Sequence, residues 1–256
     1  MKIVVALKQV PARDSVLKPD PSGRSIETAD LTYEINEPDA YALEAALQLK
    51  ERSGGEVIAL CAGPASAATQ IREALAKGAD RAIHIEEENL AQYDTLSLGQ
   101  LLAAAIRTEA PSLVLTGLQS DDLGYGQTGV IIAELLGFAH ATIIMQVELA
   151  EGGLRAKREL ENGWFQWIHL PTPAVLTIQS GLNKLRYATL MGIKKAKTKE
   201  VRRSMATGLG VSAAQGFTLE KLYAPERARQ ITMIEGNAHE QAARLAQILK
   251  REVRVI

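Results

Sequence analysis

The sequence feature that most constrains the fold is a strand, loop and helix unit in residues 112–136. A short apolar run at residues 113–116 precedes a loop with several glycines, and the apolar pattern of residues 130–136 then indicates a helix that ends at Gly137. The first N–H groups of such a helix have no partner within it, and the helix dipole adds partial positive charge there. The unit therefore predicts an α/β protein that can hold an anion such as phosphate.

The residues of this loop support the prediction without deciding it. Gly124, Gly126 and Gly129 let a ligand approach the backbone closely, and Gln127 and Thr128 add side-chain donors at the helix start. A glycine-rich connection is equally typical of a tight turn that binds nothing. Loop chemistry alone leaves both interpretations open.

Strands and helices alternate before this unit, and strands of antiparallel character follow it. Alternation of this kind favours right-handed parallel crossovers. The expected strands are residues 3–7, 57–61, 81–85, 113–116, 141–149, 154–160, 164–170 and 174–179, and the expected helices are residues 36–52, 65–77, 94–107 and 130–136. We expect an α/β fold with a doubly wound, mostly parallel sheet of the Rossmann-like, adenine-nucleotide-binding kind, with an antiparallel extension.

Two further segments are expected to be irregular. Residues 8–30 are polar and contain three prolines, which indicates an excursion with a turn at residues 21–23. Residues 181–191 are loop-like, and the basic run at residues 194–203 is typical of a solvated linker.

The C-terminal part is expected to reach a partner. Asn237 and Glu240 form a capping-box pattern that predicts a helix to about residue 251, and residues 253–256 could add a terminal strand. We divide the chain into a core, residues 1–195, and an arm, residues 196–256. An ordered arm of this length needs a surface to lie on, and we expect a partner subunit to provide it.

Composition and motifs exclude several function classes. The formal net charge of -1 gives no bulk attraction to nucleic acid or anionic lipid, and the single cysteine cannot form an internal disulfide. The four histidines lack metal-ligand spacing, and no hydrolase motif occurs. No segment approaches the ~20 apolar residues of a membrane span, and the first apolar run is too short for a signal peptide. We therefore expect a cytoplasmic protein without membrane insertion, metal, nucleic-acid partner or catalytic machinery.

Several ordered segments carry a resemblance to a known family. They are the opening strand at residues 3–10, the helix at residues 36–51, the run at residues 71–82, the loop at residues 117–129, and residues 182–190 followed by lysines. Together they resemble the β subunit of electron transfer flavoproteins over essentially the whole chain.

The resemblance implies an electron carrier subunit without its own substrate chemistry. Such a β subunit forms a heterodimer with an α subunit that carries the redox-active FAD, and it binds AMP as a structural element. Electrons would pass from a flavin dehydrogenase of the acyl-CoA dehydrogenase type, as in fatty acid oxidation, to a quinone oxidoreductase or similar acceptor.

The resemblance also implies roles for individual residues. Nucleotide contacts fall on Ala6, Asn36, Ala62, Asp122, Gly126, Gln127 and Thr128, with Gly129 added by the helix-start argument above. Partner contacts fall on Glu159 and on a recognition loop at residues 186–195, which includes Tyr187, Leu190 as the apolar anchor, Met191, Lys194 and Lys195.

Departures from the family pattern keep alternatives open. Gly126 replaces an asparagine of mitochondrial-type relatives, and residues 191–192 replace a proline and an asparagine, so the identity of the dehydrogenase stays open. A bifurcating form would hold a second FAD in the β site, but the residues at 127–130 favour AMP. A stand-alone nucleotide-binding stress-type protein is a third hypothesis, and it would leave the arm unexplained.

Overall fold

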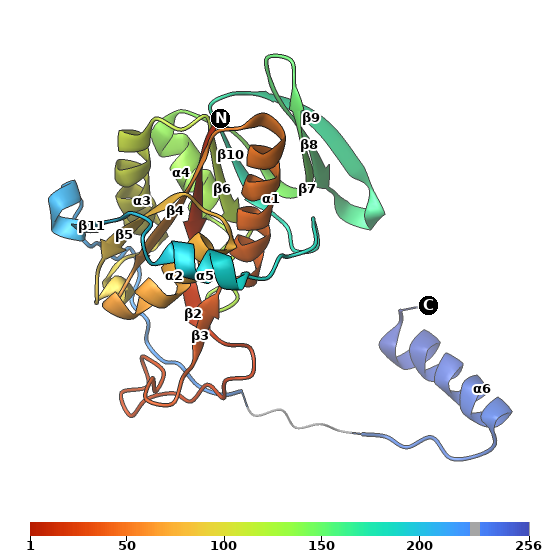
Figure 1. The fold of residues 1–256 in the computed structure, drawn as a ribbon. Helices are drawn as coiled ribbons and strands as arrows, with labels where there is room; N and C mark the ends of the chain where they lie inside the picture. The colour runs from red at the N-terminus through yellow and green to blue at the C-terminus, as the bar shows by residue number, and fades with distance from the viewer. Residues whose placement is uncertain (226–230, 256) are drawn as a thin grey trace.

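The structure, a computed structural model, describes residues 1–225 and 231–255. Its main sheet has nine strands, which are parallel except at the last two pairings (Figure 1). Their spatial order is β11 (Val201–Met205), β5 (Arg81–Glu86), β4 (Glu56–Gly63), β1 (Lys2–Leu7), β6 (Leu113–Gly117), β10 (Ala174–Ile178), β7 (Ala139–Ala150), β8 (Gly153–Glu159) and β9 (Phe165–Pro171). The mostly parallel α/β fold with an antiparallel extension, expected from the sequence, is confirmed.

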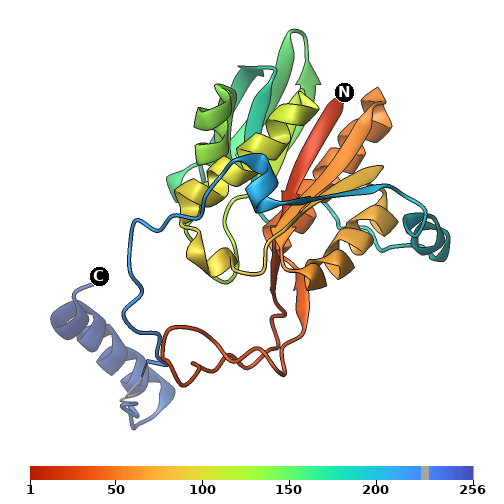
Figure 2. The same cartoon turned by 90° about the vertical axis from the view of Figure 1, so that its left-hand side faces the viewer.

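Helices cover both faces of the parallel part of the sheet (Figure 2). One face packs against α1 (Glu37–Ser53) and α2 (Ala68–Lys77), and the other packs against α3 (Thr95–Glu109) and α4 (Thr128–Leu136). Successive strand residues point to opposite faces, so Ile3 and Val5 pack in the first layer while Val4 packs in the second. Burial on both faces explains why these strands appear in the sequence as continuous apolar runs.

The antiparallel extension grows from β7, which changes partner along its length. Its first half pairs with β10 in parallel, and its second half pairs with β8. Ile143 lies at the change with a φ of 59°. This left-handed conformation is rare for a β-branched residue and redirects the strand out of the parallel sheet.

The N-terminal excursion is more regular than the sequence indicates. Its first residues form β2 (Gln9–Pro11), which pairs with β3 (Tyr33–Ile35), just beyond the excursion, in a separate two-stranded antiparallel sheet. The turn expected at residues 21–23 is present, because Pro19 and Ile26 form an antiparallel bridge around it.

Four short helical turns lie between the larger elements: η1 (Ala65–Ala67), η2 (Leu90–Gln92), η3 (Glu161–Gly163) and η4 (Ala206–Leu209).

The interpretation of the basic run at residues 194–203 as a solvated linker is wrong. Its first lysines lie in helix α5 (Leu190–Ala196), which packs on α2, and its arginines lie in the edge strand β11. The sheet therefore extends past residue 195, where we placed the start of the arm. The sequence hides this strand because Arg202 and Arg203 are exposed at a sheet edge, which removes the apolar pattern.

The C-terminal helix is confirmed, and the terminal strand is not. Asn237 and Glu240 make both bonds of the capping box at the start of α6 (Ala238–Ile248). The helix continues into a π-helical turn, η5 (Leu249–Val253), so Val253 is helical and residues 254–255 form no strand. Ile256, the last residue of the expected strand, lies outside the described residues.

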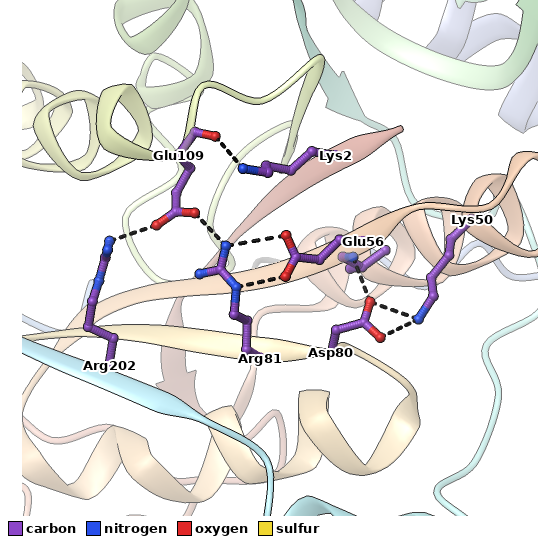
Figure 3. Close-up of polar contacts among 8 residues, drawn as sticks. Lys2, Lys50, Glu56, Asp80, Arg81, Glu109 and Arg202 are labelled. Atoms are coloured by element: carbon purple, nitrogen blue, oxygen red, sulfur yellow. Dashed lines mark hydrogen bonds and ion pairs between the residues drawn. The ribbon is translucent and has the colours of Figure 1, made fainter.

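Charged side chains tie the strands together at their amino ends (Figure 3). Arg81 at the start of β5 bonds Glu56 at the start of β4 and Glu109 at the end of α3. Glu109 also pairs with Arg202 of β11 at 2.8 Å, and its carbonyl oxygen accepts a bond from the Lys2 ammonium, also at 2.8 Å. The bond from Arg81 holds the pKa of the Glu109 carboxyl below its usual value. This end of the sheet is therefore a structural clamp.

Among the described residues, every helix is too short or too polar to cross a lipid bilayer. These residues also hold no cluster of three or more His, Cys, Asp or Glu side chains arranged as metal ligands.

Candidate functional site

The candidate site lies at the carboxyl end of the sheet, where the strand order reverses. Strand β1 has β4 on one side and β6 on the other, and the chain reaches β6 only after it has formed β4 and β5. In doubly wound sheets, ligands bind in the crevice that such a reversal creates. A cavity of about 130 Å³ occupies this crevice, and its walls come from the ends of β1, β4 and β6, the start of α3 and the glycine-rich loop.

The glycine-rich loop brings the free end of α4 to this cavity. Gly124 and Gly126 adopt φ values of 66° and 63°, a region that residues with a Cβ rarely occupy. No side chain caps α4 at Gln127. Among the described residues, the N–H groups of Thr128 and Gly129 find no hydrogen-bond acceptor. Uncapped N–H groups facing a cavity fit a phosphate or another anion.

Asn36 holds the start of this loop in place. Its side chain is 1% exposed, donates to the Gln119 carbonyl oxygen at 3.0 Å and accepts from the Asp121 N–H at 2.9 Å. Asp121 in turn accepts from the N–H of Glu37 at the beginning of α1. Because the Asn36 amide is committed to the loop backbone, its main effect on a ligand is to fix the loop.

Lys8 places a positive charge in the wall of the cavity. It directly follows β1, and its ammonium group bonds Asp122 at 2.6 Å and the Ser120 hydroxyl at 3.3 Å. Burial raises the pKa of the Asp122 carboxyl, but the charge of Lys8 together with the hydrogen bonds from Lys8, Ser120 and the Leu123 N–H leaves that pKa below its usual value. A ligand phosphate can therefore replace Asp122 as the partner of the Lys8 ammonium group.

Asp39 joins the ends of the two central strands. Its carboxylate accepts the N–H of Lys8, just after β1, and the N–H of Gly117, at the end of β6, each at 2.8 Å. Burial raises the pKa of this carboxyl to about 7, although the bonds from these N–H groups favour the charged form. The residue joins the two strand ends in the wall of the cavity.

Gly129 serves packing and does not line the cavity. A Cβ at this position would lie 2.5 Å from Thr177 Cγ2 and 2.7 Å from Thr116 Oγ1. The glycine therefore lets α4 approach β6 and β10 closely. Its predicted role in letting a ligand approach the backbone stays a prediction, and the geometry adds a packing reason for this glycine.

The structure gathers most of the predicted nucleotide residues around one cavity. Ala6, Asn36, Ala62, Gly126, Gln127 and Thr128 line it, Asp122 reaches it through Lys8, and Gly129 lies behind it. Their roles as ligand contacts stay predictions. Sequence reasoning missed Lys8 and Asp39, although a polar residue directly after a buried strand is a signal for the first of them.

The residues predicted to contact partners lie in two places. Tyr187, Leu190 and Met191 are exposed near the start of α5, with exposed fractions of 92%, 82% and 62%, and Lys194 and Lys195 are exposed on the same helix. Glu159 is half-buried at the end of β8. Figure 1 shows that α5 and the β8–β9 hairpin are separated, so these residues do not form one patch.

The hairpin that carries Glu159 has aromatic side chains stacked under cations. Arg155 lies 4.1 Å from the ring centroid of Trp167, and Lys157 lies 4.1 Å from that of Phe165. Trp164, at the tip, is 72% exposed. The cations on β8 cover part of the aromatic surface of β9, an edge strand.

Comparisons with known proteins agree on one family. Residues 24–207 match the family model described as the electron transfer flavoprotein domain. The chain is 38% identical to the electron transfer flavoprotein subunit beta of Methylophilus methylotrophus, over 97% of this chain and 98% of that protein. It is 33% identical to the mitochondrial subunit beta of Oryza sativa subsp. japonica, with both chains fully covered. It is also 34% identical to the subunit beta of Bacillus subtilis, over 87% of this chain and 88% of that one.

Proposed function

Because the chain belongs to the electron transfer flavoprotein β-subunit family, we propose that it pairs with an α subunit and binds AMP at the carboxyl end of its sheet. In this proposal the FAD of the α subunit accepts electrons from a flavin dehydrogenase of the acyl-CoA dehydrogenase type and passes them to a quinone oxidoreductase or similar acceptor. The chain acts as a carrier subunit in the cytoplasm and performs no substrate chemistry itself.

The uncapped N-terminus of α4 at the cavity is the observation that carries the AMP site. The phosphate would accept from the N–H group of Thr128, which lines the cavity, and Lys8 would add a charge-assisted bond. The cavity wall also contains the apolar side chains of Leu90, Leu98 and Leu102, which suit the flat face of an adenine ring. Polar groups at one end and apolar groups at the other fit a mononucleotide.

The size of the cavity favours AMP over a second FAD. Its volume of about 130 Å³ lies below the roughly 300–1,000 Å³ of most small-molecule sites. A nucleotide must therefore displace part of the cavity lining, and the smaller nucleotide requires less displacement. The bifurcating form stays the alternative.

The exposed residues near α5 support docking of a dehydrogenase. Leu190 and Tyr187 are apolar or aromatic, almost fully exposed and next to exposed lysines. An apolar anchor with charged neighbours is the usual form of an interaction hot spot. In this proposal the recognition loop contacts the dehydrogenase, while Glu159 and the arm contact the α subunit.

Counting the bound cofactors tests the proposal. The chain is coexpressed with its α subunit, the complex is denatured, and the released FAD and AMP are quantified against protein. We expect one FAD and one AMP per heterodimer, and two FAD without AMP would support the bifurcating alternative. Replacing Lys8 by Met should lower the AMP content and leave the FAD content unchanged, whereas the matched change Lys18→Met, on the excursion, should change neither.

A further inference from the structure

The exposed apolar residues of the recognition loop lie between two fixed points. Tyr187 lies in a stretch without regular structure, residues 184–189, and Leu190 is the first residue of the seven-residue helix α5 that follows it. A short exposed segment normally samples many conformations, and ordering it on binding costs free energy. Contacts that order this stretch before a partner binds would therefore strengthen binding.

Arg186 forms the first fixed point, directly before Tyr187. Its guanidinium donates to both oxygens of Glu44 at 2.7 and 2.9 Å, and to both oxygens of Glu51 at 2.6 and 3.2 Å. Both glutamates lie on α1, two turns apart. Glu44 is 5% exposed, and Gln48 donates to it at 2.8 Å, so this acceptor is itself held in place. A planar fork engaged by two carboxylates fixes the direction of the chain as well as its position.

Helix α5 forms the second fixed point. Thr189 caps it by accepting the Gly192 N–H at 3.0 Å, and a Cβ on Gly192 would lie 2.3 Å from the Ala76 carbonyl oxygen of α2. Ala196 is buried one turn later. One side of α5 therefore rests on α2, and this leaves Leu190, Met191 and Ile193 exposed.

We propose that Arg186 is a positioning residue, which holds the Tyr187–Leu190 surface in its docking conformation before a dehydrogenase binds. This inference rests on the docking role proposed above. The exposed Lys194, Lys195 and Lys197 beside this surface imply an acidic rim on the dehydrogenase. Because the loop is already ordered, binding avoids the entropy cost of ordering it.

The test compares Arg186→Gln with Arg52→Gln in the complex with the α subunit. Arg52 is exposed in the last turn of α1, so its replacement removes the same charge from the same region without touching the loop. Limited chymotrypsin digestion reports cleavage after Tyr187. Steady-state reduction by an acyl-CoA dehydrogenase with its acyl-CoA substrate reports the KM for the carrier and the limiting rate.

For Arg186→Gln we expect cleavage after Tyr187 and the KM each to rise by roughly tenfold or more, because the charge-assisted bonds to Glu44 and Glu51 are lost, with the limiting rate unchanged. Arg186→Lys should fall between, because an ammonium group cannot bridge both carboxylates. Arg52→Gln should match the wild type. Equal cleavage and equal KM in Arg186→Gln and Arg52→Gln would overturn the inference.

Two further variants keep the test decisive. If Arg186→Gln fails to fold, Glu51→Ala removes only the exposed half of the fork, and unchanged cleavage in that variant would overturn the inference. Leu190→Ala separates this inference from the docking proposal. If Leu190→Ala raises the KM while Arg186→Gln does not, the loop docks without the bonds of Arg186 and the inference fails. If neither raises the KM, the docking role itself fails.

Discussion

The ring of Tyr125, in the glycine-rich loop, packs edge to face against the ring of Phe217, in the arm, with centroids 6.4 Å apart and planes at 74°. Nearby arm residues are fixed to the start of α3: Asp94 donates its N–H to the Ala214 carbonyl oxygen and accepts the Gly216 N–H. Both Tyr125 and Asp94 line the cavity. The arm therefore crosses the carboxyl end of the sheet and restrains the loop that would cover a nucleotide.

This contact predicts that Phe217→Leu loosens nucleotide binding. Loss of an aromatic pair costs about 0.5–1.5 kcal/mol, so the dissociation rate of AMP should rise by about two- to tenfold. Equilibrium dialysis and stopped-flow release of a fluorescent AMP analogue measure this change. Tyr223→Leu is the matched control, because Tyr223 is an exposed aromatic residue further along the same arm. Equal rates of AMP release from both variants would show that the contact of the arm does not affect the nucleotide site.

Gly129 predicts a loss of stability. In Gly129→Ala the new methyl group must displace Thr116 or Thr177, and overpacking of this kind costs about 1–3 kcal/mol. Urea unfolding should show this decrease, while AMP still binds to the protein that stays folded. Gly208→Ala is the control, because a Cβ at position 208 has open space. If Gly129→Ala abolishes AMP binding without changing the stability, Gly129 contacts the ligand and is not a packing residue.

Asp39 predicts a pH dependence of stability. Its pKa is raised to about 7 in the folded protein, compared with ~3.9 in an unfolded chain. Between these values the folded state binds more protons, so the contribution of Asp39 is fully present below pH ~4 and is lost as the pH rises through about 7.

Asp39→Asn removes this titration. The free energy of unfolding of the wild type, minus that of the variant, should fall by about 2–4 kcal/mol between pH 4.5 and pH 8. Urea unfolding at several pH values measures it. A difference that stays constant over this range would mean that Asp39 is ionised throughout, with its charge held by the N–H groups of Lys8 and Gly117.

The sequence predicts the parallel sheet well because its strands are buried on both faces. Continuous apolar runs such as residues 57–61 leave little choice of structure. Strand β11 escapes prediction because Arg202 and Arg203 make ion pairs at a sheet edge, and the charges hide a strand that depends on tertiary contacts.

The candidate site divides in the same way. Loop glycines and the helix start are local signals, and the sequence places them correctly beside the strand end. Asp39 is not a local signal: in the sequence it is an acidic residue in the first turn of a helix, where such residues are common. Its bond to Gly117 joins residues 78 positions apart, which only the folded chain brings together.

The exposure of Leu190 predicts that shortening this side chain weakens docking of the dehydrogenase. Burying such a side chain in a partner contributes about 1.5–3 kcal/mol, so Leu190→Ala should raise the KM for the carrier about 10- to 100-fold. The FAD and AMP contents should not change. Leu17→Ala, which shortens an exposed leucine on the N-terminal excursion, is the control. A normal dependence of rate on carrier concentration would remove this loop from the docking surface.

Deletion of the arm is predicted to weaken assembly with the α subunit, and the structure shows at which residue the chain should be truncated. Truncation at residue 195 would delete β11 and the Arg202–Glu109 pair, so weakened assembly would then be ambiguous. Truncation after Pro225 keeps the sheet and the Phe217 contact and removes α6, none of whose residues is buried in this chain.

We expect the chain truncated after Pro225 to copurify with the α subunit in lower yield, with the melting temperature of the isolated β chain unchanged. A milder variant, Leu245→Glu, places a charge at an exposed apolar position of α6 and should act in the same direction. Gln241→Glu adds the same charge one turn earlier on the helix without removing an apolar side chain, and it serves as the matched control. If α6 packs on the α subunit through its apolar side, only the leucine variant and the truncation lower the yield, and full assembly of both would refute this role of the arm.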